Sequence, residues 1–156
     1  MVKAPAAVPA ASERGHVLRM ERAFKAPPAR VFAAFTDPKQ FAQWWGPEGM
    51  DCPVCELDLR VGGRWRTCVQ GREGGHCMSG VYREIVPPRR LTFTWAWEEN
   101  GVRGHETLVE MEFVPEGRHT KLLLNHRGFA DAETRDRHTK GWGSSFVCLD
   151  KFLQGE

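Results

Sequence analysis

The middle of the chain alternates short apolar and polar stretches with tight turns, and this pattern constrains the fold more than any other feature. Turn signals such as Gly62-Gly63, Pro87-Pro88 and Asn100-Gly101 separate the stretches. Strands joined by such short connections must be antiparallel, because a parallel neighbour needs a crossover of about a dozen residues or more. The six strands expected here are Val54 to Arg60, Gly63 to Gln70, Cys77 to Val86, Leu91 to Trp97, His105 to Val114 and Lys121 to Arg127.

The flanking segments add one further strand and three helices. Proline tolerates the first turn of a helix, and spacings of three and four between apolar residues indicate a buried helix face. Trp142, Phe146 and Leu149 have that spacing near the end of the chain. The expected elements are a strand from His16 to Phe24, a helix that Pro27 and Pro28 open and that runs to Thr36, a second short helix from Asp37 to Trp45, and a long amphipathic helix from Asp131 to Leu153.

This order predicts an α+β fold in which a seven-stranded, curved antiparallel sheet wraps around the long C-terminal helix. The two short helices lie between strands 1 and 2. A chain of 156 residues with 41% apolar residues suits a single domain. We expect that domain to span residues 16–154, preceded by a flexible Ala/Pro tail over residues 1–15.

Charge and composition exclude several classes of partner. The formal charge is only +2, with both signs scattered along the chain, so we expect no nucleic-acid partner. No apolar run is long enough to span a membrane, and no export signal is recognisable. Five cysteines form an odd set in a chain large enough to fold without disulfides. Reduced cysteines and a cytoplasmic location are therefore expected.

Aromatic residues are unusually rich in tryptophan and phenylalanine: six Trp and nine Phe stand against one Tyr. Alternation along the strands places many of these rings, together with His105, Thr107 and His126, on the face toward the long helix. Large rings that pack imperfectly leave apolar clefts, although the same residues can also simply fill a core. The candidate ligand-binding residues are Trp45, Trp65, Phe93, Trp95, Trp97, Met111, His126 and Trp142.

Four segments, taken in order, carry a family resemblance. They are ERAFKAPPARVFAAFTDPKQFAQWWGPEG, DLRVGGRWR, GVYREIVPPRRLTFTW and TKLLLNHRGFADAETRDRHTKGW. They resemble the activator of heat-shock-protein-90 ATPase homologue-like family, within the START-like superfamily (polyketide cyclase/dehydrase, SRPBCC). The resemblance runs from about His16 to Leu153 and implies a helix-grip fold with a deep hydrophobic cavity. It does not supply a function, because members bind different ligands or have none assigned.

Few polar residues are candidates for catalysis, metal binding or redox chemistry. His126 is the weak catalytic candidate, and a core histidine with satisfied ring nitrogens is the favoured alternative. Cys52-Pro-Val-Cys55 suggests half a zinc site or a redox pair, which Cys77 and His76 complete only if the fold brings them close. We expect two ordinary thiols, no metal and no cofactor. His105-Glu106 and Asp136-His138 do not face a common point, so they are poorly arranged for acid–base work. Glu56 and Asp58 share one strand face and suit paired carboxylates, but Arg60 lies on that face too, so a solvated charge row is favoured.

The leading hypothesis is that the protein, as a monomer or weak homodimer, binds a small hydrophobic or aromatic molecule between sheet and helix. A binding role is favoured over an enzymatic one. The first alternative is a cyclase, dehydratase or hydrolase that uses the same cavity, with His126 and also His105 moving protons. The second is a chaperone-associated or stress-response protein. That alternative is weaker because the eukaryotic activators carry an additional N-terminal domain where this chain has its short tail.

Overall fold

The computed structural model describes residues 15–155, so nearly all of the expected tail lies outside the described residues. The α+β class and the long C-terminal helix predicted from the sequence are confirmed. The elements are β1 (His16–Phe24), α1 (Pro28–Thr36), α2 (Pro38–Trp44), β2 (Asp51–Leu57), β3 (Arg64–Gly71), β4 (Gly74–Val86), β5 (Arg90–Glu99), β6 (Val102–Arg103), β7 (Thr107–Glu116), β8 (His119–Phe129) and α3 (Ala132–Leu153).

One antiparallel sheet has the order β1-β8-β7-β5-β4-β3-β2, and β6 pairs with β5 outside this path. The sequence predicts seven strands, and the two-residue β6 is the eighth. It forms because Asn100 and Gly101 both adopt positive φ, at 54° and 79°, which is the geometry of a tight hairpin turn. The turn carries the chain back so that Val102 pairs with Glu99. Two residues are too few to give a visible alternation in the sequence.

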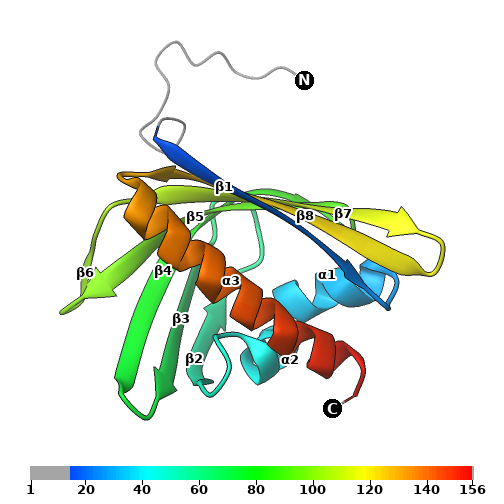
Figure 1. Cartoon of the computed structure of the whole chain (residues 1–156), viewed down its shortest axis with the longest axis horizontal. Helices are drawn as coiled ribbons and strands as arrows, with labels where there is room; N and C mark the ends of the chain where they lie inside the picture. The colour runs from blue at the N-terminus through cyan, green and yellow to red at the C-terminus, as the bar shows by residue number, and fades with distance from the viewer. Residues whose placement is uncertain (1–14, 156) are drawn as a thin grey trace.

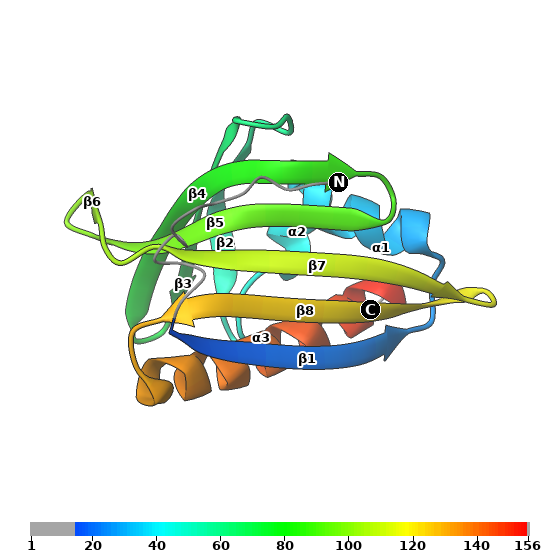
Figure 2. The same cartoon turned by 90° about the horizontal axis from the view of Figure 1, so that it is seen from above.

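The sheet curves around α3, which runs diagonally across its concave side (Figure 1). Seen from above, β4, β5, β7, β8 and β1 lie side by side, while α1 and α2 close one end of the fold (Figure 2). The N-terminus of α3 is fixed by Asp131, whose carboxylate accepts a hydrogen bond from Thr134 N at 2.7 Å. The buried face of this helix carries Trp142, Ser145, Phe146 and Leu149.

A close approach between strands explains one glycine. Trp65 on β3 pairs with Gly80 on β4, and its indole Nε1 crosses that strand to donate to Thr94 O on β5 at 3.0 Å. A Cβ at Gly80 would overlap the Thr94 carbonyl and the indole nitrogen. Glycine therefore allows this indole to pass over β4 and reach β5.

The cysteines depart from the expected reduced set. Cys68 and Cys77 are directly opposite each other on β3 and β4, with Cα atoms 4.0 Å apart, and they form a disulfide. Strand register brings this pair together, which cysteine spacing alone does not indicate. Cys52, Cys55 and Cys148 are free thiols. Across residues 15–155, no helix is both long and apolar enough to cross a membrane.

Candidate functional site

Three tryptophans divide the space between the sheet and α3 into two parts. Trp45 follows α2, Trp95 lies on β5 and Trp142 lies on α3. Their ring centroids are 5.7 Å (Trp45 to Trp95), 5.4 Å (Trp45 to Trp142) and 5.8 Å (Trp95 to Trp142) apart. We call this group the tryptophan triangle. It lines both an inner cavity, on the side of α1 and α2, and an outer pocket beside the N-terminal half of α3.

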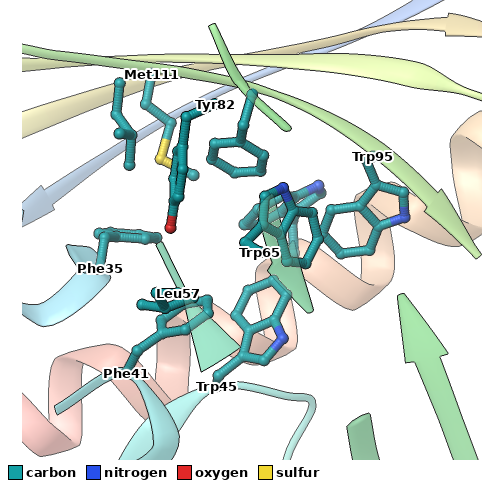
Figure 3. Close-up of a pocket in the computed structure, with 11 residues that line it drawn as sticks. Phe35, Phe41, Trp45, Leu57, Trp65, Tyr82, Trp95 and Met111 are labelled. Carbon is teal, nitrogen blue, oxygen red and sulfur yellow. The ribbon is translucent and has the colours of Figure 1, made fainter. Parts of the chain in front are cut away.

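Figure 3 shows the side chains that line the inner cavity, among them Tyr82 and Met111. The cavity has a volume of about 20 Å³, room for about one water molecule. The side chains around it are apolar apart from the Tyr82 hydroxyl, and burial raises the pKa of that tyrosine. Besides the triangle, the walls are Phe35, Phe41, Leu57, Trp65, Tyr82, Leu91, Phe93 and Met111.

The outer pocket is much larger, with a volume of about 500 Å³, within the usual range for small-molecule sites. Strands β3, β4 and β5 form one wall and α3 forms the other. The loop after α2 contributes Gly46 and Pro47. Besides the triangle, the lining residues are Gly46, Pro47, Val69, His76, Met78, Trp97, Thr134, Arg137, His138, Gly141 and Ser145.

The eight candidate ligand-binding residues fall into four groups. Trp65, Phe93 and Met111 line the inner cavity. Trp97 lies at the rim of the outer pocket, 38% exposed, and the triangle residues line both spaces. His126 lines neither, because it is fully buried behind Trp142. The structure therefore brings seven of them to a cavity wall, though not to one common space.

His126 is held by hydrogen bonds at both ring nitrogens. Trp142 Nε1 donates to His126 Nδ1 at 3.0 Å, so the ring proton is on Nε2. Nε2 then donates to Thr107 Oγ1 at 2.7 Å, and that hydroxyl donates to Trp95 O at 3.2 Å. Burial, and then nearby His138, hold the pKa of His126 well below its usual value. The ring is thus a neutral link that positions two members of the triangle.

A second histidine lies at the mouth of the outer pocket. Trp97 Nε1 donates to His138 Nε2 at 2.9 Å, while His138 Nδ1 donates to Thr134 O at 3.0 Å. The pKa of His138 is lowered, mainly by burial and also by the Arg137 guanidinium, against the opposing effect of the Thr134 bond. This neutral imidazole joins the rim of β5 to α3.

His105 departs from its expected place on the inner face. Strand β7 begins at Thr107, so His105 lies before the alternating segment and its side chain is exposed. Its Nε2 contacts Gly128 O at 2.6 Å. Thr107, the next inward position, is buried and hydrogen-bonded to His126.

Sequence reasoning missed most of the α3 wall. Thr134, His138, Gly141 and Ser145 share the face of Trp142, at steps of three or four residues. That spacing is readable in the sequence once Trp142 is taken as the inward reference. Met78 was also missed, and cross-strand register explains its place, since it lies opposite both Thr67 and Trp97.

The CxxC pair does not assemble a metal site. Cys52 Sγ donates to Val54 O at 3.2 Å, and the interaction between the two neighbouring thiols lowers the pKa of Cys52 and raises that of Cys55. Cys77 is occupied in the disulfide with Cys68. Within residues 15–155, no three side chains of the metal-binding types come together.

Comparisons with known proteins give one matching family model and several solved structures of the same fold. A family model described as "Activator of Hsp90 ATPase homolog 1-like protein" matches residues 25–154. The AHSA1 protein from Silicibacter pomeroyi is 36% identical, with a TM-score of 0.80 over 89% of this chain and 98% of that one.

Two further solved structures are similar in size and fold. A protein from Chromobacterium violaceum is 31% identical, with a TM-score of 0.77 over 86% of this chain and 95% of that one. An uncharacterised protein from Rhizobium leguminosarum is 30% identical, with a TM-score of 0.75 over 90% of this chain and 95% of that one. A comparison with curated proteins finds no match.

Proposed function

Since the chain belongs to the activator of Hsp90 ATPase homolog 1-like family, whose START-like fold generally binds ligands, we propose that it binds a small hydrophobic or aromatic molecule in the outer pocket. The observation that carries the proposal is the pocket itself, with about 500 Å³ bounded by four tryptophans. The inner cavity, at about 20 Å³, is too small for any organic ligand. The ligand is therefore expected against the outer side of the tryptophan triangle.

The lining favours a flat, apolar guest. Indole rings offer large rigid faces for stacking and lose little conformational freedom on binding. Trp45 and Trp142 each donate an indole hydrogen bond, to Thr67 at 3.1 Å and to His126 at 3.0 Å, so their faces are already oriented without a ligand. Such preorganisation improves affinity.

Gly141 offers a direct test. A Cβ at this position meets open space, and the residue lines the outer pocket. We expect Gly141→Leu to narrow the pocket and weaken saturable binding, while the fold remains at least as stable because leucine favours a helix by about 0.8 kcal/mol over glycine. Binding is followed by tryptophan fluorescence with a panel of neutral polycyclic aromatics, polyketide-like phenols and lipids.

Thr139→Leu is the matched control, because it adds the same side chain to an exposed position of α3. It should bind every active member of the panel like the unaltered protein. A panel with no saturable change in the unaltered protein contradicts the proposal, and so does equal binding by the Gly141→Leu variant.

The geometry does not favour the enzymatic alternative through His126. Both of its ring nitrogens are engaged and Trp142 separates it from the pocket. We therefore propose a structural role for His126.

A further inference from the structure

The charged groups of the outer pocket are unevenly distributed. Among the described residues that line it, Arg137 is the one permanently charged side chain, and no carboxylate takes part. His76 and His138 add two imidazoles to the lining. An acidic group on a ligand would therefore meet the Arg137 cation in a lining that contains no carboxylate.

Arg137 has partners that an acid could replace. Its NH1 lies 3.4 Å from Glu133 Oε2 and its NH2 lies 3.3 Å from Thr134 Oγ1, both near the upper limit for hydrogen bonds. The Arg137 side chain is 66% exposed and that of Glu133 82%, so solvent weakens their ion pair. A carboxylate held at the pocket mouth can accept two parallel hydrogen bonds from the guanidinium.

Two polar groups of the lining, one on α3 and one on β5, have no hydrogen-bond partner among the described residues. Ser145 is only 4% exposed, lines the pocket, and its hydroxyl forms no hydrogen bond with the described residues. Trp95 Nε1 is buried without an acceptor in the wall between the two spaces. The Ser145 hydroxyl is therefore available to hydrogen-bond to a ligand oxygen that enters this part of the pocket.

Helix geometry sets the spacing between the two ends. Arg137 and Ser145 are eight residues apart on α3, which corresponds to about 12 Å along the axis. Gly141 and Trp142 lie between them and leave an open, apolar stretch. The polar groups thus lie at the two ends of an apolar channel.

We propose that the ligand is an elongated aromatic acid, whose carboxylate pairs with Arg137 at the mouth and whose far end carries an oxygen that hydrogen-bonds to Ser145. This inference rests on the proposed function and specifies its ligand class. The ring system lies across Gly141 and against the tryptophan triangle, where its apolar surface is removed from water.

Three related probes test the inference by calorimetric titration: 6-hydroxy-2-naphthoate, its methyl ester and 2-naphthoate. We expect the hydroxy acid to bind about tenfold more tightly than its ester, as a charge-assisted hydrogen bond predicts. Arg137→Gln should abolish this advantage. Lys140→Gln, which removes an exposed charge of α3 outside the pocket lining, should retain it. Ser145→Ala should weaken the hydroxy acid severalfold to the level of 2-naphthoate.

The outcomes separate this inference from the proposed function. Equal binding of acid and ester, unchanged by Arg137→Gln, overturns the acidic ligand and leaves hydrophobic binding intact. Loss of the advantage in Arg137→Gln but no effect of Ser145→Ala overturns the contact with Ser145. If none of the three probes binds, the inference fails, and the proposed function is then judged by the neutral panel with Gly141→Leu.

Discussion

At the scale of single residues, hydrogen bonds fix how the large rings lie. Five of the six indole N–H groups donate to an acceptor within the fold, and Trp95 is the exception. The pairs are Trp44 to Ala34 O, Trp45 to Thr67, Trp65 to Thr94 O, Trp97 to His138 and Trp142 to His126. Each bond favours one orientation of a ring, and three of these rings, Trp45, Trp97 and Trp142, line the outer pocket.

The buried His126 predicts a pH dependence of stability. Its pKa is lowered in the folded protein, so the unfolded chain binds the proton more readily and stability is lost as pH falls below about 6.5. Between pH 6.5 and 5.5 this group should lower the free energy of unfolding by about 1 kcal/mol. In urea denaturation at pH 6.5 and pH 5.5, the His126→Gln variant should lose about 1 kcal/mol less of its free energy of unfolding than the unaltered protein. An equal loss in both proteins would contradict a neutral His126.

The close approach at Gly80 predicts a strong effect of one added carbon. In Gly80→Ala the new Cβ meets the Thr94 carbonyl and the Trp65 indole nitrogen, neither of which can move without breaking their hydrogen bond. Overpacking and loss of that bond should lower the free energy of unfolding by about 2–4 kcal/mol in urea denaturation. Gly104→Ala is the control, since its Cβ would meet only Trp97 O at 3.6 Å. Similar losses in both variants would contradict this account.

Side-chain direction was largely predictable from strand parity. Met111 on β7 and Leu122 and Leu124 on β8 are buried as alternation predicts, whereas β5 is buried on both faces from Leu91 to Ala96. Parity failed at His105 because the rule holds only inside a strand, and β7 begins two residues later. It also cannot distinguish a ring at the rim from one in the core, so it did not predict the exposure of Trp97.

At the scale of elements, a disulfide connects β3 and β4, two of the strands that form a wall of the outer pocket. The Cys68–Cys77 disulfide connects these strands, and the next residues along them, Val69, His76 and Met78, line the outer pocket. The link thus restrains the strand pair that forms one side of the candidate site.

The disulfide predicts how the thiols react. Without reductant, the denatured protein should expose three alkylatable cysteines, and five after reduction. Because the link closes a loop of about ten residues, its loss should lower the free energy of unfolding by about 2–3 kcal/mol. Reductant should lower the melting temperature of the unaltered protein and leave that of a Cys68→Ser, Cys77→Ser double variant unchanged. Five reactive thiols before reduction would show that the pair is open.

Element order was also readable from the sequence, while some details were not. The turn signals located each hairpin, and helical spacing located α3. The two-residue β6 depends on a turn conformation, and the disulfide depends on strand register. Neither β6 nor the disulfide leaves a signal in the spacing of apolar residues, so neither was predicted from the sequence.

At the scale of the whole molecule, the sheet and α3 enclose more space than their side chains fill. The packing of the tryptophan triangle decides how that space is divided, leaving a nearly closed inner cavity and an open outer pocket. A sequence predicts which rings face inward, but their rotamers depend on contacts between β5, α3 and the loop after α2. The position of the pocket therefore could not be predicted from parity alone.

Two buried methionines on opposite sides of the triangle test this division. Met111 lines the inner cavity and Met78 the outer pocket, and they are 3% and 2% exposed. Truncation of either to alanine should cost about 2–5 kcal/mol of stability, because each leaves a void in the core. Only Met78→Ala should change the affinity for an aromatic ligand, measured by tryptophan fluorescence under conditions where both variants are folded. If Met111→Ala alters that affinity as strongly, the two spaces communicate and the triangle is not a barrier.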